Sequence, residues 1–294
     1  MNLQNCNITK SLTGSISICQ VDRVEVLYIK HKSVEAGISL FGGHLLWFKP
    51  KGQNELLWLS DNAIFNGEKA IRGGVPICFP WFGNAGGEQT HGFARNIKWD
   101  LIDVQELEEG VQVVLELVDN EETRLMWPHK FKNTLTFVLT NTVTISLLTE
   151  NTDEHLWSYS GAIHTYFGVG DIANTSISGV GTTYLDGTEN YVKTRGENVL
   201  SIDREVIRVC TAPDESIVVC DSSNQRDIVV KNNGHNTAVV WNPWKEMTKG
   251  MTDMPDEDYK KMLCVESTIF GTVPVSLKPG ESHALETTLS IINS

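Results

Sequence analysis

Positive charge is scarce in this sequence: 24 lysines and arginines stand against 37 aspartates and glutamates, for a formal net charge of −13. A surface that binds nucleic acid or an anionic membrane needs a basic patch, so this balance argues against both kinds of partner. The net negative charge is still compatible with a small anionic ligand. An arginine in contact with its ligand attracts it at short range, whereas the distant negative charges are screened.

Long apolar runs are also missing. No stretch reaches the roughly 18 apolar residues of a membrane-spanning helix. Residues 1–14 are polar and lack the apolar centre of a signal peptide. We therefore expect a cytoplasmic protein without a membrane segment. Its 294 residues suffice to bury a large core without metals or cross-links.

Several reactive motifs are absent as well. The six cysteines include no C-x-x-C pair, so we expect buried, reduced thiols. The histidines follow no metal-ligand spacing and no H-E-x-x-H occurs, so we expect no metal site. A serine hydrolase has little support, because the sequence contains no G-x-S-x-G turn.

What the sequence does contain is a succession of strand-like segments. Alternating or β-branched runs recur, for example at residues 24–30, 111–118, 131–140, 143–150, 216–220, 227–231, 238–241 and 285–292. A tight turn is expected at Asn141, and Asn232-Asn233-Gly234 predicts a hairpin between the runs that flank it. Only residues 121–127 and 257–261 favour short helical turns.

This pattern predicts an all-β fold. Many closely spaced strands in one chain indicate a large antiparallel sandwich or barrel, and we favour the sandwich. No linker, repeat or low-complexity tract divides the sequence, so we expect a single domain over residues 1–294.

The most informative segment is residues 71–83, with 91–96 just after it. It is apolar, is broken by glycine and proline, and carries Arg72, His91 and Arg95. Aromatic walls with a few charged groups favour a small-ligand pocket. The planar guanidinium of Arg95 could hold a carboxylate or phosphate. A structural histidine and solvated arginines would explain the same pattern.

A diglycine, Gly73-Gly74, follows Arg72 directly. Such a pair is typical of turns whose backbone N–H groups converge on an anion. An ordinary glycine bend at a strand end is the alternative interpretation. The segment is not a P-loop, because no Gly-Lys-Ser/Thr follows it.

Two further residues are candidates for proton transfer. Strand alternation places His164 on the same face as Tyr166, and an imidazole can act as a general acid near neutral pH. It could equally be a core histidine with its hydrogen bonds satisfied. Glu266 ends the apolar run 262–266, where a buried carboxylate is costly unless it is paired or functional. This makes it a general-base candidate, unless it reaches solvent at the strand end.

The segment Trp241-Asn242-Pro243-Trp244 places two indoles around a proline bend. Aromatic faces can stack on sugar rings, and Asn242 could contact hydroxyl groups. Packing in the core or in a covering loop is the alternative.

Taken in order, these segments resemble the hexose-6-phosphate mutarotases, also called glucose-6-phosphate 1-epimerases, of the aldose 1-epimerase superfamily. The resemblance runs through nearly the whole chain. The matching segments are residues 56–60, 72–83, 91–96, 127–129, 164–167, 170–172, 241–243, 250–251, 253–256 and 264–266.

The resemblance implies a β-sandwich of the galactose-mutarotase type (a supersandwich), with the active site on the concave face of a sheet. It implies that Glu266 is the general base and His164 the general acid. It also implies that Arg72 and Arg95 contact the substrate, in particular its phosphate, and that His91 lies in the pocket. We expect an isomerase without cofactor or metal, and a monomer or weak dimer.

Two positions depart from the family pattern. Many members have an aspartate where this chain has Ile207, and neither Asp203 nor Glu205 can be assigned as its replacement. Some relatives place a glutamine directly before the histidine that corresponds to His91. This chain has Thr90 at that position, and Gln89 lies one position earlier. The preferred sugar is therefore open.

The implied reaction is interconversion of the α and β anomers of a hexose 6-phosphate. Glu266, as a carboxylate, would take the proton of the anomeric hydroxyl, and His164, as an imidazolium, would protonate the ring oxygen. Ordinary pKa values of about 4.3 and about 6.5 would supply these charges. The alternatives are mutarotation of unphosphorylated aldoses, a non-catalytic sugar-phosphate sensor on the same fold, and a lyase or glycosidase of polysaccharides.

Overall fold

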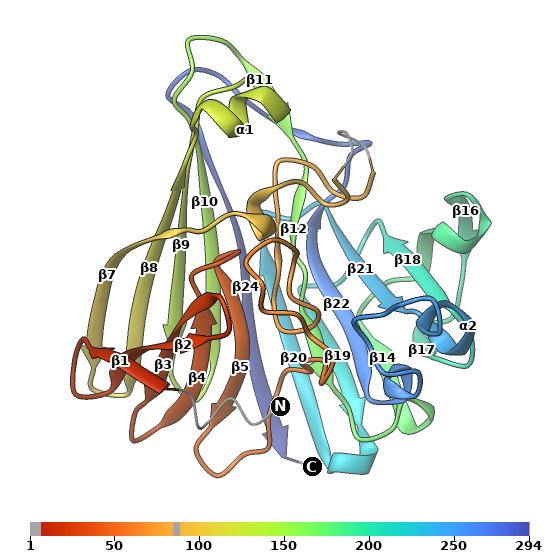
Figure 1. The fold of residues 1–294 in the computed structure, drawn as a ribbon. Helices are drawn as coiled ribbons and strands as arrows, with labels where there is room; N and C mark the ends of the chain where they lie inside the picture. The colour runs from red at the N-terminus through yellow and green to blue at the C-terminus, as the bar shows by residue number, and fades with distance from the viewer. Residues whose placement is uncertain (1–6, 85–88, 294) are drawn as a thin grey trace.

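The structure, a computed structural model, describes residues 7–84 and 89–293. These residues form mostly antiparallel strands gathered in large sheets (Figure 1). The first sheet consists of five strands that follow one another in the chain and in space. They are β1 (Asn7–Ser11), β2 (Ile16–Val21), β3 (Val24–Lys30), β4 (Val34–Ser39) and β5 (His44–Pro50).

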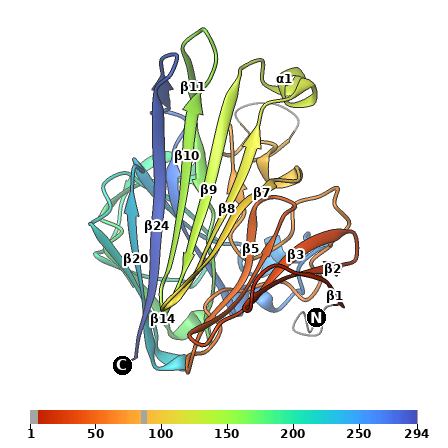
Figure 2. The same ribbon diagram turned by 90° about the vertical axis from the view of Figure 1, so that its left-hand side faces the viewer.

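A nine-stranded sheet forms one layer of the molecule, and Figure 2 shows its long strands side by side. Its spatial order is β17 (Val199–Ser201), β14 (Thr175–Ser178), β19 (Ser216–Asp221), β20 (Arg226–Asn233), β24 (Ser282–Asn293), β10 (Val143–Asn151), β9 (Phe131–Leu139), β8 (Gly110–Val118) and β7 (Asp100–Leu107). Buried and half-buried residues alternate along β9 and β10. One face of this sheet therefore packs on the core.

An eight-stranded sheet forms the layer that carries the pocket described below. Its order is β16 (Val192–Arg195), β15 (Thr183–Asp186), β18 (Val206–Cys210), β21 (Thr237–Asn242), β22 (Met262–Ile269), β12 (Gly161–Ile163) and β6 (Ile77–Cys78), with β13 (Tyr166–Gly168) also paired to β22. A separate pair joins β11 (Trp157–Tyr159) to β23 (Val275–Leu277).

The two large sheets pack face to face. One continuous core cluster contains Phe137 and Leu285 from the nine-stranded sheet and Val240 and Val265 from the eight-stranded sheet. This arrangement confirms the predicted all-β antiparallel sandwich.

Strand β22 is buried along its whole length because both of its faces are covered. Val265 and Ile269 belong to the main core, whereas Met262 and Cys264 pack in a separate cluster on the opposite face. Side chains alternate along a strand, so Glu266 lies on the same face as Cys264, away from the main core.

Helical structure is confined to short segments between strands. They are α1 (Glu121–Met126), α2 (Trp244–Thr248) and the single 3₁₀ turns η2 (Ala94–Asn96), η3 (Ile172–Asn174), η4 (Gly187–Glu189), η5 (Ser222–Asn224) and η6 (Asp258–Lys260). Both helical turns expected from the sequence are confirmed, as α1 and η6. In the part of the chain that the structure describes, no helix has the length and apolar character needed to cross a bilayer.

One turn prediction is confirmed and one is wrong. The N–H of Thr140 donates to the carbonyl of Thr142 at 2.8 Å and closes the tight turn between β9 and β10. The Asn232-Asn233-Gly234 turn makes no hairpin, because β20 pairs with β19 and β24, whereas β21 pairs with β18 and β22 of the other sheet. A turn sequence fixes a local change of direction and leaves the pairing partner undetermined.

The cysteines follow the sequence expectation only in part. Cys78, Cys210 and Cys264 are buried free thiols, and Cys220 is a half-buried one. Cys19 is disulfide-bonded, so the expectation of a reduced thiol is wrong there. The spacing of cysteines in a long chain carries no information about such pairing. Cys6 lies outside the described residues.

Candidate active site

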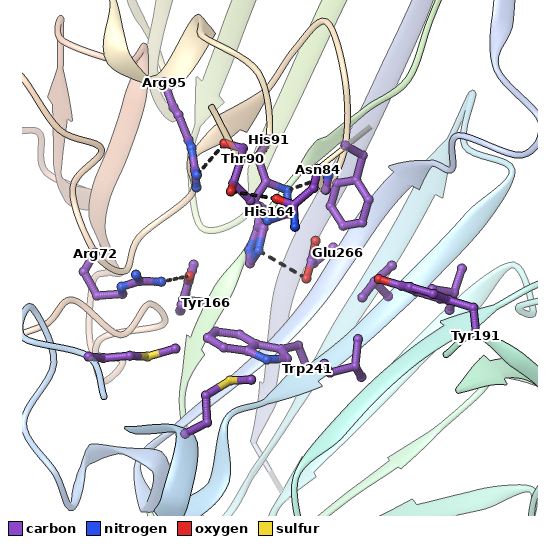
Figure 3. A pocket seen from close by; sticks show the side chains of 17 residues that line it. Arg72, Asn84, Thr90, His91, Arg95, His164, Tyr166, Tyr191, Trp241 and Glu266 are labelled. Carbon is purple, nitrogen blue, oxygen red and sulfur yellow. Dashed lines mark hydrogen bonds and ion pairs between the residues drawn. The ribbon is translucent and has the colours of Figure 1, made fainter. Parts of the chain in front are cut away.

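A pocket of about 540 Å³ opens against the eight-stranded sheet (Figure 3). All five residues singled out in the sequence line it: Arg72, His91, Arg95, His164 and Glu266. Arg72 precedes β6, His91 and Arg95 follow it, His164 lies at the break between β12 and β13, and Glu266 belongs to β22. The fold thus gathers residues from both halves of the chain into one site.

The diglycine beside Arg72 serves close packing of the backbone. Gly73 and Gly74 have φ angles of +101° and +61°, and a Cβ would lie 2.5 Å from the Trp58 carbonyl oxygen at Gly73 and 2.3 Å from the Leu45 carbonyl oxygen at Gly74. The Gly74 N–H donates to the Trp58 carbonyl oxygen at 2.7 Å, so this donor is already used and is not available to a ligand. The engaged Gly74 N–H and the close backbone contacts of both glycines therefore favour the alternative interpretation, an ordinary glycine bend.

A second glycine positions the loop that carries His91. Gly92 has a φ of +73°, and a Cβ there would lie 2.0 Å from the Phe79 carbonyl oxygen. Only glycine fits such an approach without displacing the backbone. The same Phe79 oxygen accepts the N–H of Phe93 at 3.0 Å. The loop is thereby fixed against the segment that follows β6.

The two arginines differ in how far their charge is already paired. Arg72 Nε lies 3.2 Å from Asp253 Oδ2, and its Nη1 donates to the Tyr166 hydroxyl at 3.0 Å. Interaction with Tyr166 and with Asp253 raises the pKa of Arg72, which is therefore charged. Arg95 donates from Nη2 to the Thr90 carbonyl at 2.7 Å, while its Nε is buried without a partner. Among residues 7–84 and 89–293, Arg95 makes no ion pair, so its charge is available to an anion.

His91 is a neutral hydrogen-bond donor. The Gly83 N–H donates to His91 Nδ1 at 3.2 Å, which leaves the ring proton on Nε2. Burial and the charges of Arg95 and Arg72 lower the pKa of His91 to about 3. The ring lies edge-to-face against that of His164, with centroids 5.5 Å apart.

His164 and Glu266 form a buried pair at the centre of the pocket. His164 Nε2 lies 3.4 Å from Glu266 Oε1, and the side chains are 7% and 1% exposed. The imidazole stacks on Tyr166 with centroids 4.9 Å apart and planes 14° from parallel. Both β12 and β13 pair with β22, which places the residue between them beside Glu266.

The surroundings of this pair favour the neutral form of each group. Burial raises the pKa of Glu266 well above its usual range, although Arg95 opposes the shift. Burial, followed by the interaction with His91 and the charges of Arg95 and Arg72, lowers the pKa of His164 well below its usual range. The sequence-based picture of a carboxylate and an imidazolium with ordinary pKa values is therefore wrong for the free protein. Desolvation, which the sequence does not reveal, is the main reason.

The far side of the pocket is apolar. Register places Val239 opposite Glu266, Val209 opposite Val239 and Ile207 opposite Trp241, and all of these side chains line the pocket. Neither Asp203 nor Glu205 lines it. Neither of these two carboxylates therefore replaces the aspartate that many family members have where this chain has Ile207.

Sequence reasoning missed two residues here. Asp253 holds Arg72 by an ion pair from a loop almost two hundred residues away in the chain, and no spacing rule connects them. Tyr191 lines the pocket with a φ of +60°, next to Asn190 at +53°, and its ring packs on Phe270 at 5.7 Å. Left-handed backbone at a bulky residue is uncommon and leaves no signature in the sequence.

The two tryptophans have different surroundings. Trp241 lines the pocket, whereas Trp244 packs on Tyr259 with ring centroids 5.2 Å apart. Asn242, expected as a possible sugar contact, is fully buried and donates to the carbonyls of Tyr259 and Met262. Of this segment, only Trp241 is placed to meet a ligand.

One group within the described ranges has donor atoms close enough to share a metal ion: His164, Cys264 and Glu266, whose atoms lie within 4.8 Å of one another. Sequence spacing gave no sign of it, because the histidine is far from the other two in the chain. It overlaps the pair at the centre of the pocket.

Comparison with solved structures first shows which known proteins share this fold. A galactose mutarotase related enzyme from Lactobacillus acidophilus superposes with a TM-score of 0.71 over 91% of this chain and 97% of its own, at 16% identity, which shows a shared fold. A putative mutarotase (YeaD) from Salmonella typhimurium superposes with a TM-score of 0.95 at 34% identity, over 99% of this chain and 98% of that one.

Sequence comparisons then give the family. The aldose 1-epimerase family profile matches residues 25–290. A protein of Salmonella typhimurium LT2 named "Putative glucose-6-phosphate 1-epimerase" is 36% identical over 287 residues, 97% of this chain and 96% of its own. A protein of the same name from Escherichia coli K12 is 37% identical over 283 residues, 94% of each chain. The chain belongs to the aldose 1-epimerase family.

Proposed function

We propose that the protein interconverts the α and β anomers of a hexose 6-phosphate, with glucose 6-phosphate as the first substrate to test. The observation that carries this proposal is one pocket that holds both a proton-transfer pair, His164 and Glu266, and an arginine, Arg95, that makes no ion pair within the described part of the chain. The names of the relatives at 36% and 37% identity support the phosphorylated substrate.

Proton transfer by the pair opens the sugar ring. Glu266, as a carboxylate, takes the proton of the anomeric hydroxyl, and His164, as an imidazolium, protonates the ring oxygen as its bond to C1 breaks. Both oxygens are bonded to C1, so two groups 3.4 Å apart can serve them together. Rotation about C1–C2 and reversal of both transfers closes the ring as the other anomer. Such groups typically contribute about 10²–10⁴-fold each.

The burial of the pair fits this cycle. After ring opening, Glu266 has gained a proton and His164 has lost one, so both are neutral beside the free aldehyde. The pKa of Glu266 is raised and that of His164 is lowered, which stabilises this neutral state. Because the free protein also favours this neutral form, the Glu266 proton has to move to His164 before the ring opens, and the 3.4 Å between Nε2 and Oε1 allows that transfer. The net charge of the pair stays at zero throughout, and no cofactor is needed.

The two arginines bind the phosphate of the substrate in this proposal. Arg95 makes no ion pair among residues 7–84 and 89–293, and Arg72 is held in place by Asp253 and Tyr166. A charge-assisted hydrogen bond contributes about 1.5–3 kcal/mol, so one from each arginine would favour a phosphorylated sugar by about 10²–10⁴-fold. His91, as a neutral donor through Nε2, is placed to contact a sugar oxygen.

Anomerisation rates test the proposal directly. Freshly dissolved α-glucose 6-phosphate and α-glucose are followed by polarimetry or NMR with and without the protein. We expect a large acceleration for the phosphate ester and a much smaller one for glucose. Equal efficiency on both sugars would remove the phosphate role of the arginines. Binding of glucose 6-phosphate without acceleration would instead identify a sensor.

A further inference from the structure

A thiol that the proposed reaction does not use lies beside the proton-transfer pair. Cys264 is a free, fully buried cysteine two residues before Glu266 on β22. Residues two apart on a strand share a face, and both lie next to His164. One nitrogen, one sulfur and one oxygen from these three side chains lie within 4.8 Å of one another.

Two atoms of this group also lack the partners that buried polar atoms normally have. Glu266 Oε2 and His164 Nδ1 are buried and make no hydrogen bond within the described part of the chain. Both residues are more than nine-tenths buried, and both line the pocket. Unpartnered buried polar atoms are rare, so these two side chains have hydrogen-bonding or ligating capacity that the described protein atoms do not use.

We propose that His164, Cys264 and Glu266 bind one thiophilic divalent ion, with Zn²⁺ as the test case, and that the bound ion inhibits the enzyme by occupying both proton-transfer groups. Imidazole, thiolate and carboxylate are the usual protein ligands of zinc. Three protein ligands leave a fourth coordination position, which here would face the pocket.

The distances suit such an ion. In tetrahedral zinc sites with bonds of about 2.0–2.3 Å, neighbouring ligand atoms lie about 3.3–3.6 Å apart. The His164 Nε2–Glu266 Oε1 distance of 3.4 Å already falls in this range. The widest separation in the group is at most 4.8 Å, so the side chains need to close by only about 1 Å.

The charges balance as well, although Arg72 and Arg95 lie nearby. Metal binding displaces the Cys264 thiol proton and the Glu266 carboxyl proton to solvent while a doubly charged ion enters. The net charge of the site is unchanged, so the two arginines do not oppose the exchange. Because two protons leave, binding strengthens as pH rises.

Cobalt absorption tests the site without relying on catalysis. Metal-free protein is titrated with Co²⁺, which reports a thiolate ligand through a sulfur-to-metal charge-transfer band and tetrahedral geometry through its visible bands. We expect both signals to saturate at one ion per chain, and Zn²⁺ to displace the Co²⁺. A wild-type protein that shows no such band would overturn the proposal, whether or not it anomerises hexose phosphates.

Two variants locate the site. Cys264→Ser is expected to lose the charge-transfer band and to bind Zn²⁺ at least about 100-fold more weakly, because even an outer-shell change costs about 10–100-fold. Glu266→Gln keeps the thiol but replaces the anionic carboxylate with a neutral amide, so it should bind Zn²⁺ more weakly, and it gives a second test if Cys264→Ser does not fold. Cys220→Ser, on the nine-stranded sheet, is the matched control and should bind as wild type does. Unaltered binding in Cys264→Ser would refute the assignment.

Inhibition is measured as the rate with Zn²⁺ relative to the metal-free rate of the same variant. Wild type and Cys220→Ser should lose activity and regain it with EDTA, whereas Cys264→Ser should be resistant at the same concentration. Tight binding without loss of activity would refute the inhibitory half of the proposal.

Discussion

Arg95→Met separates recognition of the phosphate from proton transfer. The guanidinium of Arg95 makes a single hydrogen bond, to Thr90, and no ion pair within the described ranges. Methionine keeps much of the side chain's apolar bulk while removing the charge. The loss of one charge-assisted hydrogen bond to the phosphate costs about 1.5–3 kcal/mol, which lowers kcat/KM for glucose 6-phosphate by about 10- to 150-fold.

The assay compares initial anomerisation rates on glucose 6-phosphate and on glucose. Both sugars are needed, because Arg95 also affects the pKa values of His164 and Glu266. We expect the loss on the phosphate ester alone, mostly as a rise in KM. Arg204→Met is the control, since Arg204 lies at the surface beside Asp203. An equal loss on glucose would refute a phosphate contact and place the effect of Arg95 on the proton-transfer pair.

Three further changes have defined outcomes. Glu266→Gln should lower turnover by about 10²–10⁴-fold with an unchanged circular dichroism spectrum, and full activity would exclude Glu266 from proton transfer. Burial lowers the pKa of His44 to about 4. Between about pH 6.5 and pH 4, His44 therefore binds a proton in the unfolded chain but not in the folded one, so the free energy of unfolding falls as the pH is lowered through this window. His44→Gln should remove about 2 kcal/mol of the loss between pH 7 and pH 5 in urea titrations, and a parallel pH profile would contradict this. Gly92→Ala should lower the free energy of unfolding by about 2–4 kcal/mol, because its Cβ would lie 2.0 Å from the Phe79 oxygen in left-handed backbone; an unchanged urea midpoint would show that the loop can move.

The positions of strands and of the turn between them could be predicted well from the sequence. The strand-like segments predicted over residues 131–140 and 143–150 are the half-buried strands β9 and β10, with the predicted turn between them. Sheet membership was not predictable in this way. The turn at residues 232–234 lies between strands that belong to different sheets, since pairing depends on contacts distant in the chain.

In the pocket, too, the residues could be predicted from the sequence, whereas the contacts formed on folding could not. Residue types indicated His164, Glu266 and the arginines, and the structure brings them together. Their protonation could not be read from the sequence, because it depends on burial. The partners of Arg72, the packing role of Gly73 and the closeness of Cys264 to the pair also arise from long-range contacts.

The position of β24 has a consequence for how the protein is made. This strand follows every other strand of the nine-stranded sheet in the chain, yet it lies inside the sheet between β10 and β20. Until β24 has been synthesised, the strands on either side of it are two separate ribbons with exposed edges. The outer layer behind the pocket can therefore close only after β24 has been synthesised, and a chain stalled before that point would present two unpaired edges to chaperones and to other copies of itself.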